Sequence, residues 1–146
     1  MKKKNILLFA MTILLIACSE QTEKASYVNA FIGTGAHGHT FPGATTPYGM
    51  VQLSPDTRVG NWDACSGYHY SDSGILGFSH THLSGTGSID LGDLLIRPTL
   101  RSLSSIIADG KITTTSFNHA DELATPGYYK VLLDKESITC ELTAFW

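Results

Sequence analysis

Basic residues are scarce in this chain of 146 residues once its first four residues are set aside. Three of its ten Lys and Arg residues are Lys2, Lys3 and Lys4, which leaves seven basic residues against thirteen Asp and Glu. The remainder therefore carries a net charge of −6 and has no basic patch. Because nucleic-acid binding needs clustered positive charge, this composition argues against nucleic acid as a partner.

Long apolar runs are also few, and the run near the N-terminus is too short to cross a membrane. "MKKKN" supplies positive charge and is followed by the apolar run "ILLFAMTILLIA". A spanning helix needs about 20 apolar residues, so the pattern is typical of a secretory signal peptide. The run ends in "LIAC", which looks like a bacterial lipobox with Cys18 as the lipidated first residue of the mature chain. An ordinary signal peptide with an incidental cysteine is the alternative.

We therefore predict a lipoprotein signal peptide over residues 1–17 and a short polar tether over residues 18–26. Acyl chains on Cys18 would anchor the protein stably to a membrane. The predicted location is outside the cytoplasm, on the periplasmic or cell-surface face. The remaining residues, 27–146, are enough for one domain with a modest core.

Cysteine is scarce as well. With Cys18 assigned to lipid, only Cys65 and Cys140 remain. An oxidising compartment permits a disulfide between them, but the sequence does not show that their geometry allows it. Two separate thiols are the other interpretation, and it is the one we favour.

Helical periodicity is nearly absent from residues 27–146. Short apolar or alternating runs are instead separated by Gly, Pro, Asn, Asp and Ser about every ten residues. This pattern is typical of an antiparallel all-β sandwich or barrel. The expected strands lie in "MVQLSPD" (ended by Pro55), "ILGFSHTHL", "LGDLLIRPTL" (buried, closed by Pro98), "KITTTSF", "GYYKVLLD" and "SITCELTAF". "YVNAFIG" is a strand or an entry segment, and "SLSSIIADG" has room for a helical turn.

Histidines are the first candidate functional group. The pairs His37/His39 and His80/His82 have i, i+2 spacing, which on a strand places both rings on one face. Two such pairs can bind Zn²⁺ or a similar metal. The sequence shows no second shell for a metal, so rings that form hydrogen bonds in a polar pocket or a core are the favoured interpretation.

Other groupings of polar residues are less specific. Ser84, His82 and Asp90 supply the side chains of a hydrolase triad, but no G-x-S-x-G turn is present. A pair of carboxylates could carry glycoside hydrolysis, yet the spacing selects no pair. The candidates for such a pair are Asp56, Asp63, Asp90 and Asp93.

The stretch "NWDACSGYHYSDSGILGFSHTHLSGTG" is unusually rich in aromatic and imidazole side chains. Trp62 beside Asp63 combines an aromatic ring, on which the apolar face of a sugar packs, with a carboxylate that binds sugar hydroxyls. The structural alternative is a Trp packed under a loop and an Asp that caps a turn. From the residues alone, the two interpretations are equally supported.

Several long motifs together resemble glycoside hydrolase family 92, a family of α-mannosidases. The resemblance covers residues 27–144 almost continuously, with the motifs in the family's order. These motifs are "YVNAFIGTGAHGHTFPGATTPYGMVQLSPDTR", "WDACSGYHYSD", "GFSHTHLSGTG", "DLGDLLIRP" and "ATPGYYKVLLDKESITCELTA".

The resemblance implies a calcium-dependent, exo-acting, inverting α-mannosidase that acts on mannosides and N-glycans. It implies an N-terminal β-sandwich, a larger helical (α/α)₆ barrel, and an active site between them. The general acid, the general base and the calcium ligands come from the barrel. Trp62 and Asp63 are then pocket residues, with Trp62 stacking on or bordering the sugar. The other residues expected around the sugar are Gly43, Cys65, His80 and His82.

The chain departs from the family in two places. The large domain is absent, and the sequence reads "ELTAFW" where the family continues "ELTAT" toward a basic residue. We therefore expect residues 27–146 to be an incomplete sandwich domain that is inactive alone. It would have no catalytic residue and no calcium ligand of its own, and the barrel domain would be its missing partner. A stand-alone carbohydrate-binding lipoprotein and a metal-binding protein are the alternatives.

Overall fold

The computed structural model of the chain describes residues 24–45, 51–89 and 92–144. The predicted signal peptide, Cys18 and most of the tether lie outside these residues, as does Asp90. Within the described ranges, no helix combines the length and apolarity needed to cross a bilayer. The elements are η1 (Lys24–Tyr27), β1 (Ala44–Thr45), β2 (Gln52–Asp56), η2 (Trp62–Ala64), β3 (Gly74–Ile75), β4 (Gly77–Ser79), β5 (Leu95–Ile96), α2 (Leu103–Ile106), β6 (Ile107–Ala108), β7 (Lys111–Ile112), β8 (Thr115–Ser116), η3 (His119–Asp121), β9 (Glu122–Thr125), β10 (Tyr128–Leu133) and β11 (Ile138–Thr143).

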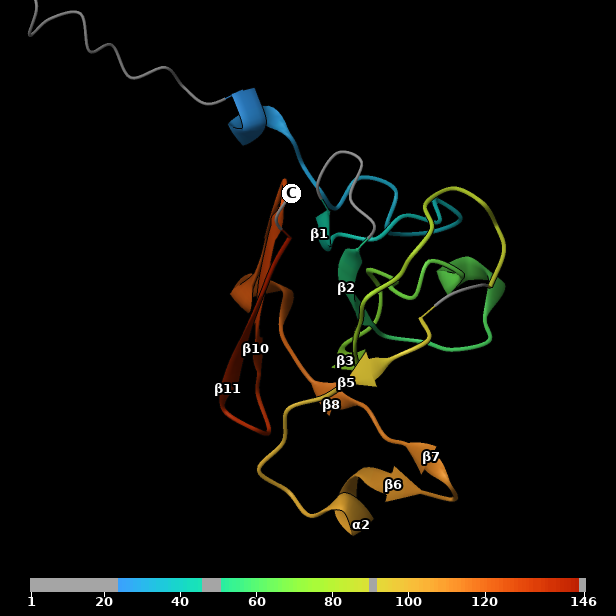
Figure 1. Cartoon of the computed structure of the whole chain (residues 1–146), viewed down its shortest axis with the longest axis vertical. Coiled ribbons are helices and arrows are strands. Elements are labelled where there is room, and N and C mark those ends of the chain that lie inside the picture. The colour runs from blue at the N-terminus through green and yellow to red at the C-terminus, as the bar shows by residue number, and fades with distance from the viewer. Residues whose placement is uncertain (1–23, 46–50, 90–91, 145–146) are drawn as a thin grey trace, which may run out of the picture.

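Two antiparallel sheets form the body of the molecule. One has the strand order β1-β2-β4-β5 and the other has the order β11-β10-β9. Strands β1 and β2 lie against β10 and β11, while α2, β6 and β7 form an arm at the lower end (Figure 1). The prediction of an antiparallel all-β fold is confirmed, and so is the helical turn expected in "SLSSIIADG".

The β9–β10–β11 sheet follows directly from its sequence. Along β10, Tyr129, Val131 and Leu133 are fully buried and alternate with partly exposed residues. Gly127 has φ +76°, which allows the tight turn after Pro126 that joins β9 to β10. Each buried apolar side chain of this kind contributes about 1.5–3 kcal/mol. The core therefore centres on this sheet, and Phe78, Phe117 and Cys140 join it.

Two expectations about individual strands were wrong. Pro55 does not end its strand but lies inside β2, opposite Phe78 of β4. Among the described residues β1 pairs only with Gln52 and Leu53, so β2 has one neighbour at Pro55, where a strand tolerates a missing N–H. The strand in "LGDLLIRPTL" is not buried either. It is β5, the last strand of its sheet, and Ile96 is 62% exposed.

Both cysteines that the structure describes are buried free thiols. The interpretation of two separate thiols is thus the one the structure supports. Burial raises the pKa of the Cys140 thiol, so this group stays protonated at neutral pH. Cys140 therefore behaves as a small apolar residue of the core.

Candidate functional site

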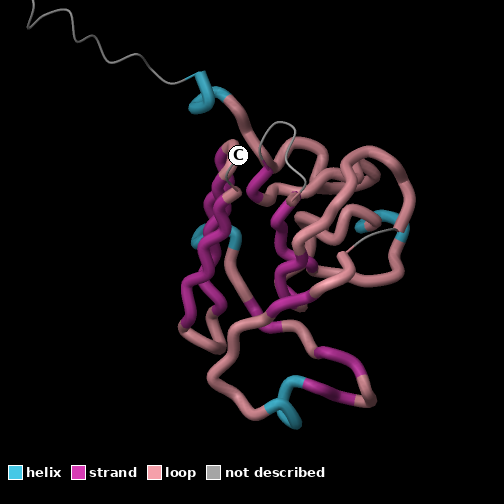
Figure 2. The backbone as a smooth tube through the Cα atoms, viewed as in Figure 1, coloured by secondary structure: helices cyan, strands magenta, loops and turns pink. Residues whose placement is uncertain are grey.

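Loops fill the side of the molecule away from the β9–β10–β11 sheet (Figure 2). Of the predicted site residues, Gly43, Cys65, His80 and His82 lie outside the helices and strands. The short helix η2 lies among these loops and carries Trp62 and Asp63. The Asn61 side chain accepts a hydrogen bond from the Asp63 backbone N–H at 2.8 Å and so caps its N-terminus. Trp62 on this turn is 54% exposed, which is unusual for so large an apolar side chain. Asp63 is partly exposed beside it.

Two histidines from a distant loop complete the surroundings of Trp62. The His39 ring meets the indole edge to face, with ring centroids 4.4 Å apart, and the His37 ring lies 5.2 Å away. His37 Nδ1 lies 2.5 Å from Asp63 Oδ1. We call these four residues, Trp62, Asp63, His37 and His39, the Trp62 cluster. It exposes an aromatic ring, a carboxylate and an imidazole together.

A third loop borders the Trp62 cluster. The Gly85 N–H donates to the His39 carbonyl at 2.6 Å. A Cβ added to Gly87 would lie 3.5 Å from Trp62 Nε1, so this glycine passes close to the indole. His39 is 8% exposed, and its Nε2 has no hydrogen-bond partner among the described residues. His39 Nε2 is therefore a buried polar atom of the cluster that forms no hydrogen bond with the described residues.

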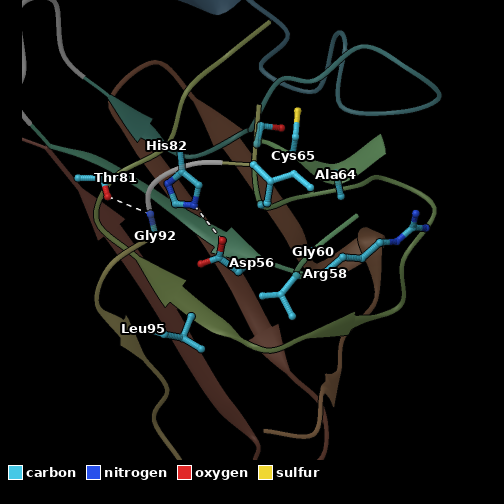
Figure 3. Close-up of a pocket in the computed structure, with 13 residues that line it drawn as sticks. Asp56, Arg58, Gly60, Ala64, Cys65, Thr81, His82, Gly92 and Leu95 are labelled. Carbon is cyan, nitrogen blue, oxygen red and sulfur yellow. Dashed lines mark hydrogen bonds and ion pairs between the residues drawn. The ribbon is translucent and has the colours of Figure 1, made fainter. Parts of the chain in front are cut away.

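A second group of polar residues lies beneath η2. Asp56 and His82 of this group line a cavity of about 250 Å³, which Ala64 and Cys65 line as well (Figure 3). His82 Nδ1 donates to the Gln52 carbonyl at 2.7 Å, while Nε2 lies 3.0 Å from Asp56 Oδ1. The Ser79 hydroxyl donates to Asp56 Oδ2 at 2.5 Å and lies 3.0 Å from His82 Nε2.

This arrangement is structural rather than that of a nucleophilic triad. A triad places its serine and its carboxylate on opposite nitrogens of the imidazole. Here Ser79 and Asp56 share Nε2, and Nδ1 is occupied by a backbone carbonyl. Asp90, the carboxylate of the triad drawn from sequence, lies outside the described residues.

The structure does not bring all six predicted sugar-site residues together. Trp62 and Asp63 are adjacent at the surface, and His82 is buried beneath them with Asp56. Cys65 caps the end of η2, with its sulfur pointing away from the Asp56–His82 pair (Figure 3). Gly43 lies just before β1, where a Cβ would come within 1.9 Å of the Leu53 carbonyl oxygen.

His80 faces a different cavity from His82. It lines an apolar groove of about 370 Å³ between β4, β5 and β11, together with Phe78 and Leu142. Both histidines follow β4 rather than lying on it, so their i, i+2 spacing does not place the rings on one face of a strand. Sequence reasoning did not place His37 and His39 beside Trp62, because residues 23 to 26 positions apart are brought together only by the fold.

No described group of three or more His, Cys, Asp or Glu side chains is arranged to hold a metal ion. The buried carboxylate of Asp56 is already engaged by Ser79 and His82. The described residues thus do not fit a calcium ion, and the family resemblance places the calcium ligands in another domain. That the calcium ligands belong to another domain remains a prediction.

The described residues thus form an all-β domain that carries an exposed aromatic ring beside a carboxylate. The glycosyl hydrolase family 92 N-terminal domain matches residues 27–145. The chain therefore belongs to glycosyl hydrolase family 92, and the family resemblance seen in the sequence is confirmed.

Solved structures agree with this assignment. A family 92 α-mannosidase from Bacteroides thetaiotaomicron, solved alone and in complex with mannoimidazole, is 39% identical, with a TM-score of 0.70 over 83% of this chain. An inverting family 92 mannosidase from the same organism is 25% identical, with a TM-score of 0.61 over 86% of this chain.

A relative from Arthroderma benhamiae, described as an uncharacterized secreted glycosidase, is 30% identical over 149 residues. That match covers 95% of this chain but 18% of the relative. The chain likewise spans 16% and 17% of the two structures of the first B. thetaiotaomicron mannosidase.

Proposed function

We propose that this chain supplies the sugar-contacting loops of an exo-acting, inverting, calcium-dependent α-mannosidase that acts on mannosides and N-glycans. The observation that carries the proposal is the Trp62 cluster. Trp62 is 54% exposed beside a carboxylate that lies 2.5 Å from an imidazole nitrogen. An aromatic face and polar side chains on one surface match the apolar face and the hydroxyls of a sugar ring. The mannosidase relatives favour mannose as that sugar.

The chain alone is proposed to lack glycosidase activity. Inverting hydrolysis needs a general acid and a general base on opposite faces of the sugar. At the Trp62 cluster the described carboxylate is Asp63, which is held by His37. We expect the purified chain, with calcium present, to release no mannose from an aryl α-mannoside. Turnover above that of the Trp62→Ala variant would contradict this proposal.

The proposed partner of this domain is a further domain, which corresponds to the part of the relatives that lies outside the matched region. The apolar groove beside β5 is a surface for such a partner, since Leu94 and Ile96 are 58% and 62% exposed there. The description of one relative as secreted supports export of this chain. Anchoring through lipid on Cys18, on the periplasmic or cell-surface face, is proposed from the lipobox alone.

Replacing Trp62 with alanine is expected to remove binding of methyl α-D-mannopyranoside by the chain. The wild-type Kd should be weak, about millimolar, because one side of a pocket offers few converging contacts. Isothermal titration calorimetry compares the two proteins, and Tyr27→Ala, which removes an aromatic ring that is 80% exposed outside the cluster, is the matched control. Equal affinity of wild type and Trp62→Ala would overturn the assignment of the cluster.

A stand-alone carbohydrate-binding lipoprotein is the second candidate, because the Trp62 ring is accessible without any partner. It predicts a Kd well below millimolar in the same titration. The titration therefore separates the two candidate functions.

A further inference from the structure

The carboxylate of Glu122 is the most completely enclosed acidic group that contacts the site-bearing loops. Glu122 begins β9, and its side chain has no exposed area. It accepts hydrogen bonds from Tyr68 Oη at 3.1 Å and Tyr129 Oη at 2.5 Å, and it lies 2.7 Å from His119 Nδ1. An ionised carboxylate has acceptor sites for all three donors. Burial, and then the charge of Glu122, raise the pKa of both tyrosines, so their hydroxyls stay protonated and donate.

The first connection from Glu122 to the Trp62 cluster passes through Tyr68. Tyr68 is 1% exposed and lies four residues beyond the end of η2. The Gly67 N–H donates to the Ala64 carbonyl at 2.8 Å, which ties the segment before Tyr68 to the last residue of η2. The hydroxyl of Tyr68 therefore fixes the segment that leaves the helical turn bearing Trp62 and Asp63.

The second connection passes through His119 and reaches the loop that bears His37 and His39. The His119 ring stacks on Tyr70, with centroids 4.2 Å apart and planes 18° apart. The Tyr70 N–H donates to the Thr34 carbonyl at 2.9 Å. Next to Tyr70, His69 Nε2 lies 3.1 Å from the Ala36 carbonyl oxygen, one residue before His37.

We propose that Glu122 is the positioning residue of the Trp62 cluster, and this inference rests on the proposed function of that cluster. One buried carboxylate holds both of the loops whose side chains meet around Trp62, through Tyr68 on one side and His119 on the other. Glu122 does not touch the cluster, so it acts through these partners. Its third partner, Tyr129, belongs to the core of β10 and reaches neither loop by these contacts.

Tyr68→Phe and Tyr129→Phe form a matched pair that tests this proposal. Each substitution removes one tyrosine hydroxyl that donates to Glu122, so each should lower stability. Only Tyr68 is tied to η2. In a Trp146→Phe background Trp62 is the sole tryptophan, and its acrylamide quenching reports how the indole is held. We expect Tyr68→Phe to raise the quenching constant about twofold and to weaken methyl α-D-mannopyranoside binding roughly fivefold to tenfold, as loss of one such hydrogen bond allows. Tyr129→Phe should change neither value.

Equal effects of the two substitutions on Trp62 quenching, or no effect of either, would overturn the positioning role. The quenching measurement needs no ligand, so it decides this role even if the wild-type chain binds no mannoside. Absence of mannoside binding would instead count against the proposed function of the cluster. Circular dichroism detects whether either variant has lost cooperative unfolding. In that case Glu122→Gln replaces the unfolded variant in the quenching measurement, and it should raise Trp62 quenching as Tyr68→Phe does.

Discussion

Replacing His82 with alanine is expected to lower the free energy of unfolding by roughly 3–5 kcal/mol, because it leaves a cavity in the interior and takes one hydrogen-bonding partner from the buried Asp56 carboxylate. The side chains of His82 and Asp56 are 3% and 10% exposed. The ring donates through Nδ1 to the Gln52 carbonyl, and its Nε2 lies 3.0 Å from Asp56 Oδ1. Its removal leaves the Asp56 carboxylate, which is 10% exposed, with the Ser79 hydroxyl but without the imidazole.

Urea unfolding followed by circular dichroism measures this loss. Ser79→Ala is the matched control, since it removes one hydrogen bond from the same carboxylate and should cost about 1–2 kcal/mol. The Asp56→Ala/His82→Ala double variant should be more stable than the sum of the single losses predicts, because no unpaired charge remains. Additive losses would show that the pair is not coupled.

The second large effect is expected at Gly43, where alanine should destabilise the fold by about 3 kcal/mol or more. The added Cβ would lie 1.9 Å from the Leu53 carbonyl oxygen and 2.6 Å from Ser54 Cα. These are backbone atoms of β2, so they cannot move aside as a flexible side chain does. The close approach of the chain before β1 to β2 therefore requires glycine.

Gly35→Ala is the control for Gly43→Ala, since the nearest atom to its added Cβ is Tyr70 Cβ at an ordinary 3.8 Å. It should change the unfolding free energy by less than about 0.5 kcal/mol. Thermal and urea unfolding compare the two variants. If Gly43→Ala were as stable as Gly35→Ala, the close packing of β1 on β2 would be wrong, and the predicted contact of Gly43 with sugar would be the remaining reason for a glycine there.

The strands that sequence predicts best are those whose alternation meets a single core. In β10, Tyr129, Val131 and Leu133 mark the buried face in the sequence itself, and β11 pairs with it in full register. The prediction for Pro55 was wrong because the effect of a proline depends on whether a neighbouring strand needs an N–H donor at that position, and this is a property of the sheet. β5 was wrongly predicted to be buried because an apolar run has the same sequence pattern whether its side chains face the core or an open groove.

In the candidate site, too, local features could be predicted from the sequence and long-range contacts could not. The neighbours Trp62 and Asp63 are visible in the sequence as a possible sugar contact, because their spacing is local. The pairing of Asp63 with His37 joins residues 26 positions apart, and the bond of Tyr68 to Glu122 joins residues 54 apart. Nothing in either segment indicates its partner. The separation of His80 from His82 likewise depends on how the chain turns after β4.

The most direct test of the proposed function is a titration of methyl α-D-mannopyranoside followed at the indole N–H signals of the ¹⁵N-labelled chain. Trp62 and Trp146 are its two tryptophans, and Trp62→Ala assigns their signals. We predict that the Trp62 indole signal moves progressively and saturates at millimolar sugar. A Trp62 signal that stays fixed throughout the titration would contradict the assignment of this cluster as the sugar-contacting surface.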